Sequence, residues 1–322
     1  MRANGLMQEN KVHFNPKIMA VGLNPAWQKT LLFPEFIPGE VNRAAKISLF
    51  PAGKGINFAR AAGIWGAEVL VCQFLGGQTG KNIKDGLAKE RLRHLTVNAS
   101  SQTRTCTTCL CGKSGQMTEL IEPSAEIPSH LVKTLKNKIL DRLTSHSGIA
   151  LCGTYPAGVG ADFYADIAAT ARKSGKPVML DGVTGVGKTL DAGIHVLKVN
   201  KSEFSILSGK KNIFQGAKSF FRRYNVEIAA VTAGPSNAFL FDENGLYEYK
   251  LPDCGRILNP IGAGDTVSAV LFSELLRGRM PAEAFRLALG AGTASCFRLK
   301  SADFSPKQAR NIAGEIRIKK RK

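Results

Sequence analysis

Residues 259–269 read NPIGAGDTVSA, and this stretch decides how the rest of the sequence is interpreted. Two glycines form a short loop, and apolar residues follow it at helical spacing until Gly278, which stands where a C-terminal cap belongs. A glycine loop that opens a helix leaves backbone N–H groups unpaired at the positive end of the helix dipole, where a phosphate or a developing oxyanion can bind. Asp265 lies at the mouth of this expected anion site. It either accepts a proton or faces a metal ion there, or it simply caps the helix.

A second glycine loop occupies residues 51–61, PAGKGINFARA, and it also opens a helix, which ends near Gly66. Together the two stretches resemble the paired signatures of the PfkB family of ribokinase-like carbohydrate kinases, within it the branch of 1-phosphofructokinases and tagatose-6-phosphate kinases. The resemblance extends from about residue 18 to residue 302. Shorter motifs follow in the family's order: LNPA at 23–26, FLGG at 74–77, TRT at 103–105, GTYPAG at 153–158, KVNKSE at 198–203 and VTAG at 231–234.

The composition is that of an ordinary globular protein, with 44% hydrophobic and 21% charged residues among 322. No apolar run reaches the length that crosses a membrane, and residues 1–14 are polar and lack a signal-peptide core. We therefore expect a cytoplasmic protein without a membrane partner. Cys106, Cys109 and Cys111 form a cluster, but no fourth ligand is near, so reduced structural cysteines are expected rather than a metal site.

The net charge of +19 marks the chain as strongly basic. The last six residues supply five of these charges, so the excess is not confined to the C-terminus. A basic surface raises the local concentration of anionic ligands such as a nucleotide or a sugar phosphate. It would equally favour non-specific contact with nucleic acid, and the composition does not choose between the two.

Apolar and helical segments alternate along most of the chain, which favours a parallel, doubly wound α/β sheet with helices on both faces. Residues 1–17 are interpreted as a disordered lead-in, residues 18–315 as one domain and residues 316–322 as a basic tail. Two β-rich excursions, at about 28–50 and 102–123, are expected to form a small separate sheet. The resemblance implies that this inserted sheet is a lid over the sugar site, and often a homodimer surface.

The resemblance implies phosphoryl transfer from ATP to a sugar hydroxyl, a reaction that depends mostly on positioning and on charge stabilisation. The hydroxyl needs a base, and Asp265 is the candidate for this role. The N–H groups of Gly262, Ala263 and Gly264 are expected to stabilise the charge that develops on the transferred phosphoryl group.

One part of the sequence carries the expected contacts with ATP and Mg²⁺. Asn200 and Glu203 match the family's Asn-x-x-Glu motif, which organises Mg²⁺ and its waters around the phosphates. The alternative for Glu203 is a plain position in the first turn of a helix. The resemblance places Lys198 near the nucleotide phosphates and makes Thr232 and Gly234 nucleotide contacts.

The sugar is expected to lie between the first glycine loop and two turns. Asn24 belongs to the turn after the first strand, and Gly53 lets the backbone approach the sugar closely. Asn57 is expected to face the same pocket one helical turn later. Thr154 occupies the place where relatives present a small hydroxyl residue or glycine.

Lys54 and Arg104 are the candidates for holding the phosphate that is already on the sugar. Arginine suits this role because its planar guanidinium binds phosphate oxygens in a bidentate manner. The alternative for both residues is a solvated surface charge.

Two positions depart from the usual family pattern. Relatives usually carry an aspartate where this chain has Gln28, which can hydrogen-bond to a sugar but offers no charge. The usual Asp/Ser-Thr pair before the anion site is Asn259-Pro260, a version that the tagatose-phosphate kinases resemble. Residues 118–123, TELIEP, also favour that branch, whereas the NPA turn and the GKGIN loop favour the fructose-1-phosphate kinases.

Residues 182–189, GVTGVGKT, fit the P-loop pattern and follow an expected strand. A P-loop needs a full helix after its lysine to supply the dipole, and only about five residues separate Lys188 from the next strand. We therefore interpret this segment as a variable loop.

The sequence thus predicts an ATP- and Mg²⁺-dependent sugar-phosphate kinase, with D-fructose 1-phosphate as the first expected substrate and tagatose 6-phosphate as the second. Two other classes stay open as alternatives. One is a P-loop NTPase built around Lys188, and the other is a kinase-fold regulatory protein that binds nucleic acid through its positive charge. The intact set of expected catalytic positions argues against the latter.

Overall fold

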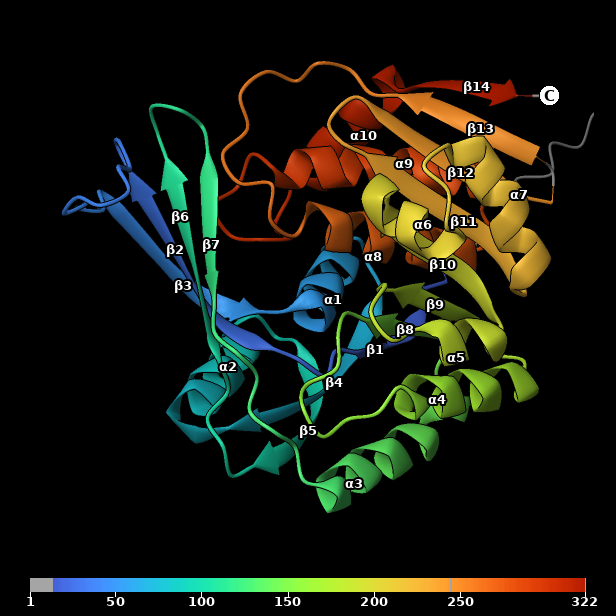
Figure 1. The fold of residues 1–322 in the computed structure, drawn as a ribbon, viewed down its shortest axis with the longest axis horizontal. Helices are drawn as coiled ribbons and strands as arrows, with labels where there is room; N and C mark the ends of the chain where they lie inside the picture. The colour runs from blue at the N-terminus through green and yellow to red at the C-terminus, as the bar shows by residue number, and fades with distance from the viewer. Residues whose placement is uncertain (1–13, 244, 322) are drawn as a thin grey trace, which may run out of the picture.

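The computed structural model describes residues 14–243 and 245–321, and it has the α/β architecture that the sequence predicts. Among these residues, ten strands form one large sheet and four strands form a second, small sheet. Figure 1 shows helices on both sides of the large sheet and the small sheet at one edge of the molecule. Of the expected lead-in, residues 1–13 lie outside the described part, and Lys17 already begins the first strand.

Seven of the described strands run parallel and form the large sheet from its middle to one edge. Most of them are nearly continuous apolar runs, as expected for strands that helices cover on both faces. In sheet order they are β11 (Val226–Ala233), β10 (Ile194–Asn200), β9 (Val178–Asp181), β8 (Gly148–Cys152), β1 (Lys17–Val21), β4 (Glu68–Gly76) and β5 (Arg93–Ala99).

The helices cover the two faces of this sheet in separate groups. Successive side chains of a strand point to opposite faces, so Val71 joins one hydrophobic core and Cys72 joins the other. The first core packs against α1 (Lys54–Ile64), α2 (Gly77–Lys89), α8 (Ala263–Leu276), α9 (Pro281–Ser295) and α10 (Pro306–Glu315). The second packs against α3 (Ser129–Leu140), the 3₁₀ turn η1 (Leu143–Ser145), α4 (Asp162–Lys173), α5 (Gly187–Asp191), α6 (Lys201–Ser208) and α7 (Ile213–Arg223). Within the described residues, no helix is both long and apolar enough to span a bilayer.

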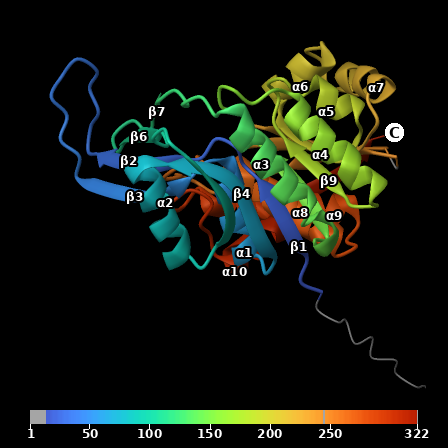
Figure 2. The ribbon, with the colours of Figure 1, turned by 90° about the horizontal axis from the view of Figure 1, so that it is seen from below.

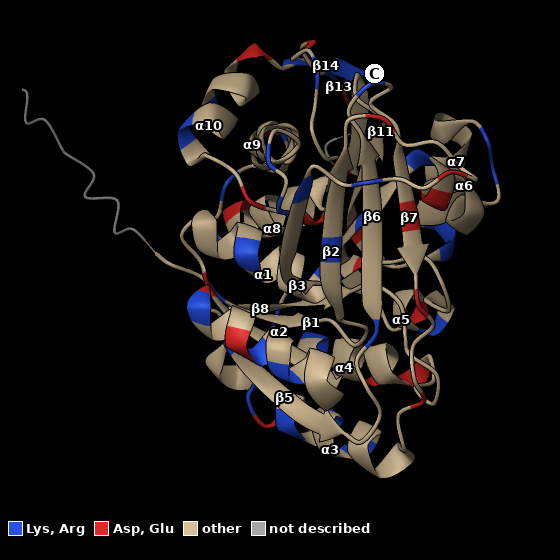
Figure 3. Cartoon of the chain, turned by 90° about the vertical axis from the view of Figure 1, so that its left-hand side faces the viewer, with Lys and Arg blue, Asp and Glu red and all other residues tan. Residues whose placement is uncertain are grey.

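Three antiparallel strands extend the large sheet beyond β11: β12 (Asn237–Asp242), β13 (Gly245–Lys250) and β14 (Arg317–Arg321). The run that the sequence suggests as a basic tail is therefore the edge strand β14, not a free tail. Ile318 packs against the core, and Arg321 forms an ion pair with Glu248 of β13. Figure 3 shows β14 largely in the colour of lysine and arginine.

The small sheet consists of the two β-rich excursions, as the sequence predicts. Its strands, in spatial order, are β3 (Lys46–Ala52), β2 (Ala26–Phe33), β6 (Thr105–Cys111) and β7 (Met117–Ile121). Figures 1 and 2 both place it at one side of the molecule, away from α6 and α7. Cys106, Cys109 and Cys111 lie in β6 as free thiols, and the described residues contain no cluster of three side chains that could hold a metal ion.

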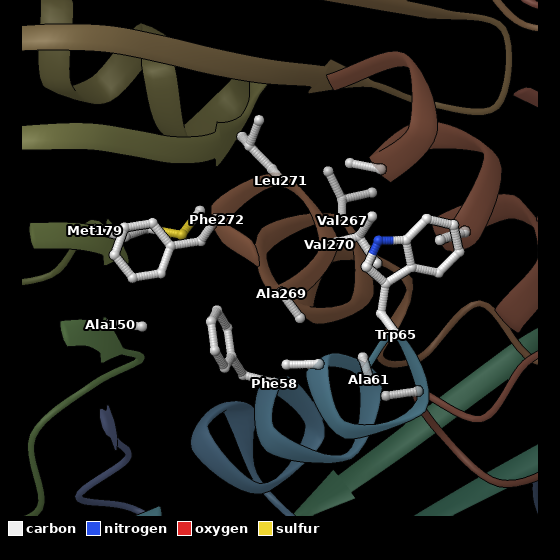
Figure 4. Close-up of a cluster of buried hydrophobic side chains, with 14 of the residues drawn as sticks. Phe58, Ala61, Trp65, Ala150, Met179, Val267, Ala269, Val270, Leu271 and Phe272 are labelled. Carbon is white, nitrogen blue, oxygen red and sulfur yellow. The ribbon is translucent and has the colours of Figure 1, made fainter. Parts of the chain in front are cut away.

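Helices α1 and α8 begin at the two glycine loops and pack against each other. Figure 4 shows Phe58 and Ala61 of α1 facing Ala269 and Val270 of α8 in a shared hydrophobic cluster. The start of α1 also lies tightly against the end of β1, because a Cβ added to Gly55 would lie 2.7 Å from Gly22 Cα. This packing brings the two glycine loops, far apart in sequence, to one place.

Candidate active site

Strands β1 and β8 are neighbours, and the chain continues from them across the sheet in opposite directions. After β1 it passes to β4 and β5, and after β8 it passes to β9, β10 and β11. Open α/β sheets bind ligands at such a switch point. A pocket of about 150 Å³ lies here, lined by the chain after β1, the start of α1 and the chain after β8. Its lining includes five of the predicted substrate contacts: Asn24, Gly53, Lys54, Arg104 and Thr154.

The pocket offers polar groups suited to an anionic sugar derivative. Asn24 Nδ2 donates to Thr154 Oγ1 at 3.3 Å, and Ser124 Oγ donates to Asn24 Oδ1 at 2.8 Å. Arg104 Nη2 donates to the backbone carbonyl of Asn24 at 3.1 Å. Arg104 Nε is buried and has no hydrogen-bond partner within the described part of the chain. An anionic ligand oxygen would satisfy that nitrogen.

Asp265 lies in the first turn of α8 and is 8% exposed. Asn57 Nδ2 of α1 donates to Asp265 Oδ2 at 2.7 Å, so the two glycine-loop helices meet at this carboxylate. Burial raises the pKa of Asp265, nearby Lys54 lowers it and Asp181 raises it again, and the net shift is upward. A carboxylate with a raised pKa is a better proton acceptor than an ordinary aspartate.

Asp181, at the end of β9, organises the charges next to Asp265. Lys54 Nζ lies 2.5 Å from Asp181 Oδ1, Lys198 Nζ lies 3.9 Å from Oδ2, and Ser268 Oγ donates to Oδ2. Burial alone would raise the pKa of Asp181, but Lys54 and Lys198 outweigh burial and lower it. Burial likewise lowers the pKa of Lys54, but Asp181 and Asp265 outweigh burial and raise it. Lys54 thus stays charged beside the expected base.

Sequence reasoning missed Asp181. The available signal was its position at the carboxyl end of an apolar strand, VMLD, where the side chains of parallel strands meet at one edge of the sheet.

Two predicted substrate contacts point elsewhere in the structure. Gln28 Nε2 donates to Thr108 Oγ1 of the neighbouring strand β6 at 2.8 Å, and Gln28 is only 4% exposed. The side chain of Asn57 is equally buried and binds Asp265. Neither lines the pocket at the switch point. In this structure the amide of Asn57 is used within the protein, so its contact with the sugar stays a prediction.

A larger pocket, of about 830 Å³, is lined by the start of α8, by α9 and by the chain after β11. It includes Thr232 and Gly234, the predicted nucleotide contacts, together with Gly264. Val267 and Leu289 give it an apolar wall. Its size and mixed lining fit a ligand with a ring system and a polar end.

The predicted anion site lies at the start of α8, next to the side chain of Lys198. Gly262 has a φ of +82°, a left-handed conformation that glycine adopts readily. A Cβ added to Gly264 would lie 2.6 Å from Lys198 Nζ, so the ammonium group lies directly against the first turn. The N–H of Ala263 already donates to the Pro260 carbonyl at 3.3 Å, which leaves fewer free amides than the sequence suggests.

Asn200 and Glu203 form a capping box at the start of α6. Asn200 Oδ1 accepts from the Glu203 N–H at 2.9 Å, and Glu203 Oε2 accepts from the Asn200 N–H at 2.8 Å. This is the helix-terminal alternative that the sequence left open for Glu203. The capping box uses the single side-chain oxygen of Asn200, whereas Glu203 carries a second carboxylate oxygen outside it.

The P-loop pattern does not form a P-loop. The helix that follows it, α5, has only five residues, and Lys188 pairs with Asp162 of α4 at 2.6 Å. Both side chains are more than 60% exposed. Lys188 is a surface ion pair, as the shortness of the segment predicts.

Comparisons with known proteins agree with this geometry. A model described as "pfkB family carbohydrate kinase" matches residues 15–308. The chain is 25% identical over 312 residues to a tagatose-6-phosphate kinase of Staphylococcus epidermidis, covering 94% of this chain and 99% of that protein.

Two solved structures share the fold. Phosphofructokinase-2 from Escherichia coli, in complex with fructose-6-phosphate, has a TM-score of 0.81 at 23% identity and covers 93% of this chain and 99% of its own. A possible 1-phosphofructokinase from Thermotoga maritima has a TM-score of 0.86 at 18% identity and covers 95% of this chain and 100% of its own.

Proposed function

The chain belongs to the pfkB family of carbohydrate kinases, enzymes that transfer a phosphoryl group to an alcohol, and on this premise we propose its substrates. It transfers the terminal phosphoryl group of ATP to D-fructose 1-phosphate, which gives fructose 1,6-bisphosphate and ADP. The observation that supports the proposal is that Lys54 and Arg104 line one pocket at the switch point, and that the charge of Lys54 also acts on the buried carboxylate of Asp265.

The proposed mechanism assigns one role to each end of the sugar phosphate. Its phosphate binds Lys54 and the unsatisfied guanidinium nitrogen of Arg104. Its free hydroxyl then faces Asp265, which accepts the proton as the hydroxyl oxygen attacks the terminal phosphorus of ATP. The bond to the ADP oxygen breaks, and Lys198 beside Gly264 stabilises the charge on the phosphoryl oxygens.

The nucleotide is proposed to occupy the 830 Å³ pocket, with its ring system between Val267 and Leu289. Mg²⁺, when bound with ATP, neutralises charge on the phosphate oxygens. Mg²⁺ keeps several waters and needs few protein carboxylates when phosphates supply ligands. Glu203 and Asn200 fit that requirement, because Glu203 retains one carboxylate oxygen outside the capping box.

Tagatose 6-phosphate is the second candidate substrate. The support is specific: a relative named tagatose-6-phosphate kinase matches 94% of this chain, and Asn259-Pro260 fits the pattern of that branch. Both sugars are ketohexose phosphates, so the same two cations would hold either one.

We also propose a homodimer that forms through the small sheet. One face of this sheet exposes Ile47, Leu49 and Leu120, which are each more than half exposed. Leu31 pairs with Ile47 on the same face, so this face carries apolar side chains from β3, β2 and β7, with Lys29 and Thr107 between Leu49 and Leu120. We also propose a cytoplasmic location, as expected from the sequence, and the seven free cysteines support it.

The experiment is a coupled ADP-release assay with Mg²⁺ and ATP across a panel of acceptors. The panel holds fructose 1-phosphate, tagatose 6-phosphate, fructose 6-phosphate, unphosphorylated fructose and a nucleoside. We expect turnover on fructose 1-phosphate, and tagatose 6-phosphate in its place would select the second candidate. Turnover confined to unphosphorylated acceptors would contradict the role of Lys54 and Arg104, and no turnover on any acceptor would contradict the proposed activity.

A further inference from the structure

Arg60 of α1 is 5% exposed, and its guanidinium joins four separate parts of the chain. Nε and Nη2 donate to the two carboxylate oxygens of Glu90, just after α2, at 2.6 and 3.1 Å. Nη2 also donates to the carbonyl of Pro51 in β3 at 2.6 Å. Nη1 donates to Asn57 Oδ1 at 3.2 Å and to the carbonyl of Ser301 at 3.1 Å. All five N–H donors of the guanidinium are therefore used.

These contacts leave the amide of Asn57 one orientation. Asn57 Oδ1 accepts from Arg60 Nη1 and, at 3.0 Å, from Ser301 Oγ. A flipped amide would turn its NH₂ group toward a guanidinium, which has no acceptor atom. Asn57 Nδ2 must then point the other way, where it donates to Asp265 Oδ2 at 2.7 Å. The orientation of the base is thus linked to Arg60 by two hydrogen bonds in series.

We propose that Arg60 is a positioning residue for the reaction, which aligns the Asp265 carboxylate by fixing the amide of Asn57. The inference rests on the proposed function, since it assigns Asp265 the role of base. Asn57 occupies Oδ2 of Asp265 and leaves Oδ1 to receive the proton from the sugar hydroxyl. The contact with Pro51 adds a link to the small sheet, and the guanidinium also lies 5.8 Å from the ring centre of Phe50 in the same strand.

Other charged groups act on Asp265 directly and must be kept constant in any test. They are Lys54 from α1, Asp181 from β9 and Lys198 from β10. Arg60→Lys leaves all three in place and preserves the total charge. It removes the planar fork, so one ammonium group cannot hold Glu90, Pro51 and Asn57 together.

The chain offers a matched control in Arg277, next to the end of α8. Its guanidinium also joins two helices, donating to Glu274 at 2.9 Å and to the carbonyls of Trp65 and Gly66 at 3.2 and 2.9 Å. Within the described residues, none of its hydrogen bonds goes to Asn57. Arg277→Lys therefore reports what the same substitution does when only helix packing is involved.

The first measurement titrates the Asp265 carboxyl by ¹³C NMR in the full-length protein without substrates, with the signal assigned from Asp265→Asn. A purely structural arginine would not move this titration. We expect Arg60→Lys to raise the pKa of Asp265 by about one unit, because the donor that favours the charged form is lost. Asn57→Ala should give the same shift, the double variant no further shift, and Arg277→Lys none.

The second measurement is turnover on the active sugar phosphate. Arg60→Lys should lower kcat by roughly ten- to hundredfold through misalignment, with KM for ATP unchanged. A folded Arg60→Lys variant with wild-type titration of Asp265 would overturn the inference. An enzyme that turns over no sugar would overturn the proposed function, while the titration would still decide the role of Arg60.

Should Arg60→Lys fail to fold, Glu90→Gln tests the same link while keeping the guanidinium. Removing the negative charge of Glu90 would lower the pKa of Asp265 through space, whereas loosening Arg60 raises it. An upward shift in the folded Glu90→Gln variant supports the inference, and a downward shift or none overturns it.

Discussion

At the scale of single residues, the site depends on how one buried carboxylate neutralises two lysines. Asp181 is 3% exposed. It accepts hydrogen bonds from Lys54 and Ser268 and forms a longer ion pair with Lys198. Lys54 keeps 38% of its side chain exposed, whereas Lys198 keeps only 6%. Removing Asp181 would leave the charge of Lys198 buried without its partner, which is costly in a protein interior.

Asp181→Asn should therefore lower the free energy of unfolding at neutral pH by about 2–4 kcal/mol, toward the lower end because Lys54 is partly solvated. The folded protein lowers the pKa of Asp181, so this stabilisation is complete above the pKa of the unfolded chain and is lost as the pH falls below about 4. Urea unfolding at several pH values measures the difference between the two proteins.

The control for this prediction is Asp162→Asn, which removes the exposed partner of Lys188. Exposed ion pairs contribute little, so no measurable change is expected. An equal loss of stability in both variants would mean that the Asp181 cluster has no special role.

Local motifs were enough to select Asp265, Lys54 and Arg104 as candidates, because glycine loops and a short TRT segment mark them in the sequence. The direction of a side chain was not predictable in the same way. Asn57 turns to Asp265, and Gln28 pairs with Thr108, a residue on another strand. Both outcomes depend on partners far away in sequence, which only the tertiary structure brings close.

At the scale of secondary-structure elements, the position of the site depends on close helix packing. A Cβ added to Gly290 of α9 would lie 2.4 Å from the Ala309 carbonyl of α10, and one added to Gly292 would lie 2.5 Å from Val267 Cγ2 of α8. The first turn of α8, which carries Asp265, is thus held by α9 without space for further atoms. The position of this first turn is therefore fixed by packing against α9 as well as by contacts within the site.

Gly290→Ala should therefore destabilise the protein by about 1–3 kcal/mol, because backbone atoms of α10 must move. Gly314→Ala is the matched control on α10, where no atom lies within 4 Å of the added Cβ. It should be neutral or stabilising by up to about 1 kcal/mol, since alanine favours the helix. Urea unfolding of both variants tests this, and a stable Gly290→Ala protein would show that α9 and α10 can separate at low cost.

The parallel strands were predictable because their apolar runs alternate with helical segments. Two edge strands were not. In β5 the polar residues Arg93, Thr96 and Asn98 interrupt the apolar pattern, and β14 carries four basic residues around Ile318. An edge strand needs burial on fewer sides, and charge on it discourages pairing with other chains, so its sequence resembles a loop or a tail.

At the scale of the whole molecule, the small sheet has an inner and an outer face with different properties. Gln28, Thr30 and Thr108 on one face are almost fully buried. The opposite face carries Leu49 and Leu120, which are 52% and 59% exposed. An apolar face of this kind on a projecting sheet is typical of a surface that another protein covers.

Leu120→Asp should separate the proposed homodimer into monomers, because its strand partner is the neutral Thr107 and the charge would be buried at the interface. Ile206→Asp on α6 is the control, since Ile206 is 72% exposed and lies outside the small sheet. Sedimentation velocity at micromolar concentration distinguishes the forms. A monomeric wild-type protein, or equal dissociation of both variants, would contradict the proposed interface.

The role of Asp265 as the base is tested by comparing wild-type protein with Asp265→Asn on the sugar phosphate that turns over. The asparagine keeps the size of the side chain and its place beside Asn57, but it cannot accept the proton as the carboxylate does. We predict that kcat falls by about 10²- to 10⁴-fold, the usual contribution of a positioned base, while KM for the sugar phosphate stays within a few-fold. A variant that retains more than roughly a tenth of the wild-type kcat would contradict the assignment of Asp265 as the base.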